Sequence, residues 1–243
     1  MNIRKWDDLP DILKTREVRK YYDALKKKTF ALFWKRVFDI IASFFMIVFF
    51  APIFLLISIA IKCDSSGPVF YRQVRITQYG KPFRIFKFRS MVTDADKKGS
   101  LITVDHDSRI TGVGNFLRKT KIDEMPQLFN ILTGDMSFVG TRPEVPKYVD
   151  QYTSEMMATL LLPAGITSLA SIYYKDENSL LDQTDDVDTV YMEKILPDKM
   201  KWNLQGLMEY SFLGDLKLMF MTFFAACGKD YKSNGADYER NRC

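Results

Sequence analysis

The chain has 243 residues, of which 47% are hydrophobic and 27% are charged, so it can bury a sizeable core and is not an intrinsically disordered protein. Its formal net charge is +5, and its single histidine, His106, excludes mechanisms that need two histidines and leaves carboxylates, lysines and arginines to carry any chemistry. The three cysteines are odd in number and lack metal-ligand spacing, which argues against a disulfide framework and favours a reducing, cytoplasm-facing environment.

The positive charge is concentrated in two stretches. Residues 1–36 contain 11 basic and 5 acidic side chains, and residues 62–89 contain 7 basic and 1 acidic side chain. Within the first stretch, residues 12–36 mix aromatic and aliphatic side chains with lysines and arginines at roughly helical spacing. This pattern predicts an amphipathic helix at a membrane interface. A charged helix that packs on the protein has the same pattern and stays open as the alternative.

Residues 40–61 form a run of 22 uncharged, mostly apolar residues. A straight helix of this length extends about 33 Å, enough to cross a hydrocarbon core of about 30 Å. Near the middle of the run, however, Ala51 is followed by Pro52, which removes a backbone donor, and both flanks are strongly basic. Because the positive-inside rule places both flanks on the cytoplasmic side, the pattern favours a re-entrant helix-break-helix hairpin over a spanning helix.

Residues 67–92 alternate apolar and basic side chains around a turn signal at residues 79–82, which predicts a hairpin or two short strands. In an extended strand, residues two positions apart share a face, so Lys87 and Arg89 are expected to lie together. Two cations on one face suit a phosphate group or the membrane surface, whereas ordinary solvation of a strand is the alternative.

The segment KIDEMPQLFN, residues 121–130, places Asp123 and Glu124 shortly before Pro126 and an apolar helical pattern. Proline prefers the first turn of a helix, and Gly134 suits a helix end, so a helix is predicted between them. The amino end of a helix stabilises negative charge, and capping by Asp123 is the simplest explanation of the acidic pair.

A tight loop with the sequence GDMSFVGTRPE follows at residues 134–144. Its proline holds the preceding Arg142 in extended geometry. A fixed arginine suits two-pronged recognition of a phosphate group, and a salt bridge to a local acid such as Glu144 is the alternative.

These blocks occur in the order of the motifs of a known family. The motifs are KRVFDII ahead of the proline-containing run, GPVFYRQVR, FKFRSM, DSRITGVGNFLRKTKIDEMPQLFNILTGDMSFVGTRPE and a later GIT, and they cover roughly residues 35–226. With them the chain resembles the bacterial sugar transferases that load a sugar phosphate onto polyprenyl phosphate, the monotopic phosphoglycosyl transferases. The resemblance implies an α+β, mostly helical fold that is membrane-associated, with a re-entrant helix-break-helix hairpin, a small strand element and interfacial amphipathic helices.

The resemblance further implies that Asp123 and Glu124 are a catalytic dyad. Asp123 would attack the β-phosphorus of a UDP-sugar and release UMP, and polyprenyl (undecaprenyl) phosphate would then take the sugar phosphate from the carboxylate. Glu124 is expected to act as a general base toward the lipid phosphate or to support a magnesium ion, Mg²⁺, for which Asp123 would be the ligand.

Further site residues are expected around this dyad. The cations that would bind the substrate phosphates are Lys87, Arg89, Arg118 and Arg142, and the residues that would support the nucleotide or the loop are Gln127, Pro143 and Glu144. The expected partners are a UDP-sugar, polyprenyl phosphate and membrane lipid, with no nucleic acid, and a homodimer stays open. The expected location is the bacterial inner (cytoplasmic) membrane, with the catalytic domain on the cytoplasmic face.

The expected organisation is a basic amphipathic N-terminal region at residues 1–36, a re-entrant hairpin at 37–62, a catalytic domain at 63–227 and a disordered tail at 228–243. The chain departs from the family pattern at Ala51, where serine is usual, and after GIT, where SLASIYYKDE replaces a segment associated with substrate fit. The sugar therefore stays open. Alternative functions are a membrane-tethered scaffold, an inactive assembly partner, or an ordinary glycosyltransferase that releases UDP.

Overall fold

The computed structural model describes residues 3–95, 107–174, 187–226 and 231. The helices are α1 (Arg16–Lys26), α2 (Thr29–Asp64), α3 (Gly112–Lys119), α4 (Gln127–Thr133), α5 (Pro146–Val149), α6 (Leu169–Tyr173), α8 (Val187–Val190), α9 (Leu196–Met208) and α10 (Phe212–Ala226). The strands are β1 (Phe70–Ile76), β2 (Pro82–Phe88), β3 (Met136–Val139) and β4 (Ala164–Thr167). A mostly helical fold with a small strand element is thus confirmed, whereas the predicted disordered tail lies outside the described residues apart from Tyr231.

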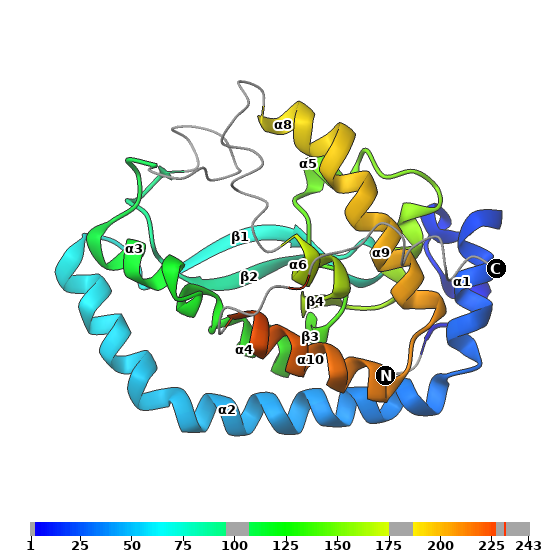
Figure 1. Cartoon of the computed structure of the whole chain (residues 1–243), viewed down its shortest axis with the longest axis horizontal. Coiled ribbons are helices and arrows are strands. Elements are labelled where there is room, and N and C mark those ends of the chain that lie inside the picture. Colours follow the sequence, from blue (N-terminus) through cyan, green and yellow to red (C-terminus); the bar gives the residue numbers. More distant parts are fainter. Residues whose placement is uncertain (1–2, 96–106, 175–186, 227–230, 232–243) are drawn as a thin grey trace.

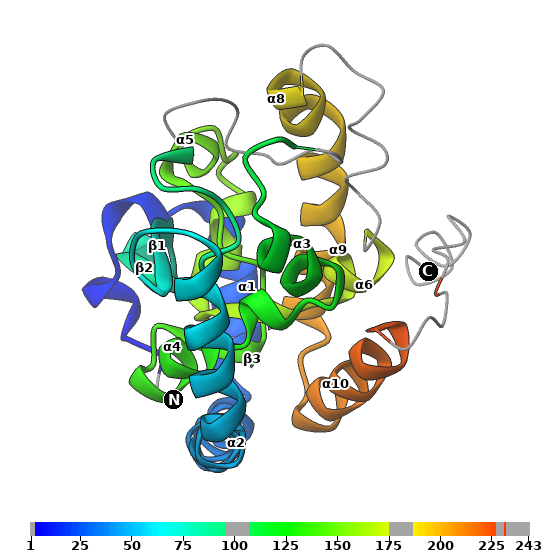
Figure 2. The same ribbon diagram turned by 90° about the vertical axis from the view of Figure 1, so that its left-hand side faces the viewer.

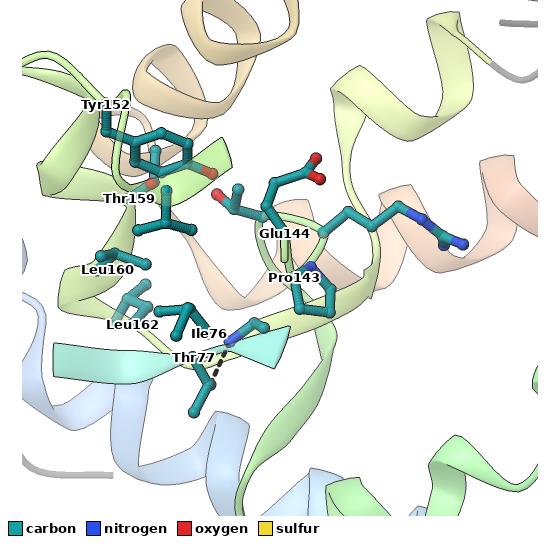
Figure 3. Close-up of a pocket in the computed structure, with 12 residues that line it drawn as sticks. Ile76, Thr77, Pro143, Glu144, Tyr152, Thr159, Leu160 and Leu162 are labelled. Carbon is teal, nitrogen blue, oxygen red and sulfur yellow. Dashed lines mark hydrogen bonds between the residues drawn. The ribbon is translucent and has the colours of Figure 1, made fainter. Parts of the chain in front are cut away.

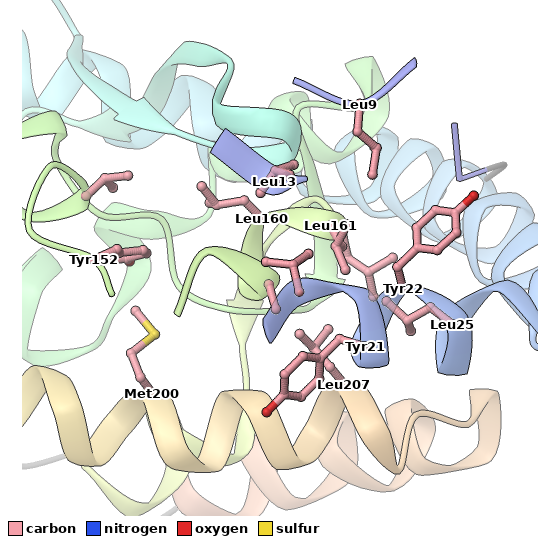
Figure 4. Close-up of a cluster of buried hydrophobic side chains, with 14 of the residues drawn as sticks. Leu9, Leu13, Tyr21, Tyr22, Leu25, Tyr152, Leu160, Leu161, Met200 and Leu207 are labelled. Atoms are coloured by element: carbon pink, nitrogen blue, oxygen red, sulfur yellow. The ribbon is translucent and has the colours of Figure 1, made fainter. Parts of the chain in front are cut away.

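The amphipathic segment at residues 12–36 is divided between two helices. α1 begins after Thr15, whose hydroxyl accepts a hydrogen bond from the backbone N–H of Val18. Its apolar side is buried in a hydrophobic cluster shared with α9 and the turn at residues 156–161 (Figure 4). The prediction of an interfacial helix is therefore wrong for α1, because protein, not lipid, covers its apolar face.

α2 is one continuous helix of 36 residues, and Pro52 lies inside it. The helix runs along one side of the molecule and turns toward β1 in its later part (Figure 1). A proline can bend a helix without ending it when the flanking turns stay helical. The predicted break at Ala51 and Pro52 is therefore replaced by a single helix, and two separate hairpin arms are not seen.

Both ends of α2 are attached to the same globular body. Near its start, Arg36 donates to the carbonyl oxygens of Ile131 at 2.6 Å and Leu132 at 3.0 Å, at the end of α4. At its end, the carboxylate of Asp64 accepts a hydrogen bond of 3.0 Å from the backbone N–H of Val113, in the first turn of α3. Each contact satisfies backbone groups that a helix end leaves unpaired.

Much of the α2 surface between these attachments is exposed and apolar. Of the helices in the described part of the chain, α2 alone is long and apolar enough to cross a membrane. α10 also exposes large apolar side chains, Leu213, Phe220, Phe223 and Phe224. Seen from the end of the molecule, α2 and α10 lie on the same side (Figure 2). The two helices therefore give one side of the protein an apolar surface.

The predicted hairpin at residues 67–92 is confirmed. β1 and β2 pair antiparallel around the 3₁₀ turn Gln78–Gly80, and in this register Tyr71 lies opposite Lys87. β3 and β4 form a separate parallel pair. Gly165 of β4 packs against Gly140, the residue that follows β3. A Cβ added to Gly165 would lie 2.1 Å from the backbone nitrogen of Gly140, so this close approach requires glycine. The loop that carries Arg142 leaves from this point.

Candidate active site

Glu124 is held by two cations from distant parts of the chain. It ends the 3₁₀ turn Ile122–Glu124, and Met125 and Pro126 separate it from α4. Lys87 of β2 donates to its Oε1 at 2.7 Å. Arg142 donates from both terminal nitrogens, Nη1 to Oε2 at 3.2 Å and Nη2 to Oε1. We call Lys87, Glu124 and Arg142 the Glu124 cluster.

The Glu124 cluster keeps its carboxylate ionised. Burial by itself raises the pKa of Glu124, but the charges and hydrogen bonds of Arg142 and Lys87 outweigh it and hold this pKa well below its usual range. Burial also lowers the pKa of Lys87, and the charge of Glu124 opposes that change. The carboxylate is therefore a weak proton acceptor and a strong anchor for two cations.

Asp123 lies next to this cluster but is bonded differently. The residue is 7% exposed. Within the described residues its carboxylate accepts no hydrogen bond. Burial and the charge of Glu124 raise the pKa of Asp123, whereas Lys87, Arg118 and Lys121 lower it. Its oxygens are therefore available to a substrate or a cation.

The predicted capping role of Asp123 is not seen. α4 begins at Gln127, as the sequence predicted, and its N-cap is Pro126, which makes no side-chain cap. The helix ends at Gly134, which has the left-handed φ of +96° expected there. The acidic pair is thus placed at the amino end of α4 without satisfying its backbone donors.

Arg89 and Arg118 occupy different positions relative to the Glu124 cluster. Arg89 is buried and donates through Nη2 to the carbonyl of Ile61 at 3.3 Å and that of Ser65 at 2.6 Å, so it caps the end of α2. The predicted pair of cations does not meet at one partner: Lys87 donates to Glu124, whereas Arg89, whose backbone N–H still donates to the carbonyl of Val69 at 2.9 Å, directs its guanidinium to the end of α2. Arg118, in the last turn of α3, is close enough to lower the pKa of Asp123.

The residues predicted to support the loop lie behind Arg142. Pro143 and Glu144 line one side of a cavity of about 10 Å³, with Tyr152 and Thr159 on the other side (Figure 3). This volume is at the lower limit for a single water molecule. The cavity is therefore too small for a sugar nucleotide.

Sequence reasoning named Gln127 and did not name Arg75. Gln127 is buried in the first turn of α4, and within the described residues its Nε2 has no hydrogen-bond partner. Arg75 of β1 donates to the carbonyl oxygen of Pro143 at 3.1 Å. The strand alternation in GPVFYRQVR could have placed Arg75 on the face of Tyr71, which pairs with Lys87, but only once the register was known.

The residues fit a magnesium ion only in a limited way. Within the described part of the chain, no group of three or more histidine, cysteine, aspartate or glutamate side chains could hold a metal. Mg²⁺ in phosphate-transferring sites is commonly held by one or two carboxylates together with substrate phosphates. Asp123, whose oxygens accept no hydrogen bond in the described structure, suits such a site, whereas Glu124 is already engaged by two cations.

Comparisons with known proteins show the family of the chain. The family model described as bacterial sugar transferase matches residues 30–229. The chain is 39% identical over 194 residues to a UDP-glucose:undecaprenyl-phosphate glucose-1-phosphate transferase of Klebsiella pneumoniae, a match that covers 79% of this chain and 39% of that protein. It is 35% identical over 191 residues to a protein of the same name from Caulobacter vibrioides, covering 77% of this chain and 67% of the relative.

A third relative is named for a different sugar. The UDP-N-acetylgalactosamine-undecaprenyl-phosphate N-acetylgalactosaminephosphotransferase of Aeromonas hydrophila is 41% identical over 145 residues, which is 58% of this chain and 34% of that protein. The chain thus spans about two fifths of the Klebsiella relative and about one third of the Aeromonas relative. Similar identity to proteins named for two sugars leaves the sugar open.

Proposed function

The chain belongs to the bacterial sugar transferase family, and on this basis we propose that it transfers a sugar 1-phosphate from a UDP-sugar to polyprenyl (undecaprenyl) phosphate and releases UMP. One observation carries the proposal. Asp123, a buried carboxylate that accepts no hydrogen bond from the described residues, lies beside a glutamate that holds Lys87 and Arg142 in place. A nucleophile and a cationic phosphate site are thus adjacent.

In the first step, an oxygen of the ionised Asp123 carboxylate attacks the β-phosphorus of the UDP-sugar. A bond forms between this oxygen and phosphorus, the bond from phosphorus to the bridging oxygen breaks, and UMP leaves with that electron pair. The raised pKa of Asp123 makes the carboxylate a better electron donor, and Lys87, Arg118 and Lys121 favour its ionised form. The enzyme then holds a sugar phosphate on Asp123.

In the second step, a phosphate oxygen of the polyprenyl phosphate attacks the same phosphorus, and the bond to the Asp123 oxygen breaks. The product is a polyprenyl diphosphate-sugar, and the carboxylate is regenerated. A phosphate monoester has a second pKa of about 6, so at neutral pH the acceptor is largely ionised and needs no general base.

Glu124 acts as a positioning residue for the cations in this account. Its pKa lies well below the usual range because of Arg142 and Lys87, which overcome the opposing effect of burial. A carboxylate of that kind is a poor base at neutral pH. We therefore choose cation support over the general-base role that the sequence also allowed. Mg²⁺, when bound with Asp123 as its protein ligand, would neutralise diphosphate oxygens and lower the repulsion between two anions.

We further infer that α2 enters one leaflet and returns, with the catalytic face on the cytoplasmic side of the bacterial inner membrane. A straight helix that crossed the bilayer would separate its ends by a hydrocarbon core of about 30 Å. In this molecule Arg36 binds α4 and Asp64 binds α3, so both ends of α2 meet one body. The bend in α2 and the basic residues on both flanks support the same arrangement.

The test of the reaction uses detergent-solubilised protein, Mg²⁺, undecaprenyl phosphate and a panel of UDP-sugars, with UMP and UDP measured separately. UMP release with one donor supports the proposal and names the sugar. Release of UDP would show ordinary glycosyl transfer. A folded protein that released neither nucleotide would favour a membrane-tethered scaffold or an inactive assembly partner.

A further inference from the structure

Two arginines approach each other at the edge of the proposed active site. Burial lowers the pKa of Arg75, and the nearby charge of Arg142 lowers it further, while Glu144 has the opposite effect. Each arginine has its own glutamate. Arg142 is paired with Glu124, and Nη1 of Arg75 lies 3.9 Å from Oε2 of Glu144. Both carboxylates are therefore needed if the two cations are to remain close.

Arg75 fixes the backbone directly after Arg142. Its Nη1 donates to the carbonyl of Pro143 at 3.1 Å, and its Nε and Nη2 donate to Oε1 of Gln73 at 3.0 and 2.7 Å. The backbone N–H of Ile76, the next residue of β1, donates to the carbonyl of Glu144 at 3.0 Å. Two consecutive residues of β1 thus hold two consecutive carbonyls of the loop. The position of Arg142 depends on these contacts.

The carboxylate of Glu144 receives its short hydrogen bond from a distant helix. The hydroxyl of Tyr191 donates to Oε1 of Glu144 at 2.6 Å, and both residues are buried. Lys199, also buried, lies with its Nζ 3.3 Å from the same hydroxyl. Because Arg75 is too far from Glu144 for a hydrogen bond, the hydroxyl of Tyr191 makes the shorter of these two contacts with the carboxylate.

Tyr191 is itself fixed at an unusual place in the chain. It is the first residue of the π-helical turn Tyr191–Ile195, which lies between α8 and α9. Such widened turns are frequently found at functional sites. The ring of Tyr191 packs against that of Tyr148, with the ring centres 5.0 Å apart. The hydroxyl therefore has little freedom to leave Glu144.

We propose that Tyr191 is a positioning residue, which acts through Glu144 and Arg75 to keep Arg142 aligned for the substrate diphosphate. The proposal rests on the proposed function, because it assigns a purpose to the alignment of Arg142. It links the helical segment after residue 187 to the proposed phosphate site. The hydroxyl of Tyr191 does not touch substrate in this account.

The test compares Tyr191→Phe with Tyr148→Phe. Each substitution removes one tyrosine hydroxyl that donates to a carboxylate, at 2.6 Å to Glu144 in one case and at 2.7 Å to Asp188 in the other. UMP release gives kcat/KM, and calorimetry with UDP gives the affinity for the nucleotide without turnover. We expect Tyr191→Phe to lower kcat/KM about tenfold and to weaken UDP binding, and Tyr148→Phe to change either by less than about twofold.

A merely structural role is separated by a double variant. If Tyr191 acts through Arg142, adding Tyr191→Phe to Arg142→Lys lowers kcat/KM by less than about twofold beyond Arg142→Lys alone. Equal kcat/KM values for the single variants Tyr191→Phe and Tyr148→Phe would overturn the proposal and leave the proposed function intact. The same holds if adding Tyr191→Phe to Arg142→Lys lowers kcat/KM by a further factor of about ten. Wild-type protein that neither releases UMP nor binds UDP would overturn both.

Discussion

Two of the charged clusters in the described part of the molecule differ in their access to solvent. At the start of α2, Lys35 donates to the carbonyl of Val139 at 2.8 Å and to the carboxylate of Asp215 at 2.6 Å, and its side chain is 4% exposed. In the Glu124 cluster the side chain of Arg142 is 36% exposed. Burial of a charge is common to both clusters, so burial alone does not mark an active site.

The two clusters differ in whether a ligand from solution can replace the hydrogen-bond partners of their cations. Lys35 and Asp215 tie α2 to α10 and to the end of β3, and their partners are internal. Lys87 and Arg142 hold a carboxylate at an open edge, where phosphate oxygens can compete for the same donors. We infer that the first cluster serves stability and the second serves binding, and the following predictions test that division.

The largest expected effect is the loss of activity in Asp123→Asn. Removal of the nucleophile is expected to lower UMP release by about 10⁴-fold or more. Because the pKa of Asp123 is raised in the folded protein, its ionised form costs stability at every pH above the unfolded value of about 3.9. The variant should therefore have a higher Tm than wild type at pH 7. Retained turnover would remove Asp123 as the nucleophile.

Lys35→Met is expected to do the opposite of Asp123→Asn: it should lower stability and leave activity unchanged. Breaking a buried ion pair by removing one partner typically costs about 3–5 kcal/mol, because the remaining charge is left uncompensated. Denaturant unfolding in detergent should show this loss, while UMP release per folded molecule stays near wild type. Lys194→Met, at an exposed lysine, is the control and should change stability by less than about 0.5 kcal/mol. Normal stability of Lys35→Met would contradict the assigned role of this cluster.

Arg142→Lys keeps the charge but loses the two-pronged contact. We expect UMP release to fall about 100-fold, since a lysine cannot reproduce a forked hydrogen bond to a carboxylate or a phosphate. Thermal unfolding should change little, because the arginine side chain is partly exposed. Full activity in this variant would show that the site requires the positive charge of Arg142 and not its two-point hydrogen bond.

The smallest expected effect is on stability, in the difference between the free energies of unfolding of wild type and Glu124→Gln as the pH changes. The pKa of Glu124 is held well below its usual range by Arg142 and Lys87 against the effect of burial, so its charge stabilises the folded state above the unfolded pKa of about 4.3. At pH 7 the free energy of unfolding of wild type should exceed that of the variant by about 1–2 kcal/mol, a figure reduced because solvent around Arg142 screens the charges. This difference should shrink as the pH falls through the folded pKa; a constant difference would contradict the assignment.

Part of this arrangement could be predicted from the sequence because the signals are local. The hairpin around residues 79–82 and the helix between Pro126 and Gly134 follow from turn residues and periodicity. The amphipathic pattern of α1 was misassigned because a core and a lipid phase impose the same helical period. The partner of Arg89 could not be predicted because it is the end of α2, which lies 24 residues earlier in the chain.

Other features depend on contacts between distant segments. Lys87, Glu124 and Arg142 were each predicted as site residues, but nothing local indicates that one carboxylate binds both cations. Arg75 was missed because its role depends on the carbonyl of Pro143, and Tyr191 because its partner lies 47 residues away. Pairings of this kind become visible only when the strands and helices are in place.

The most direct test of the central claim is the intact mass of the protein after incubation with Mg²⁺ and the UDP-sugar, without the lipid acceptor. We predict a sugar phosphate adduct on the wild-type protein, together with a burst of UMP, and neither in Asp123→Asn. Addition of undecaprenyl phosphate should remove the adduct. An adduct that persists in Asp123→Asn, or UMP release by wild type without any adduct, would contradict covalent transfer through Asp123.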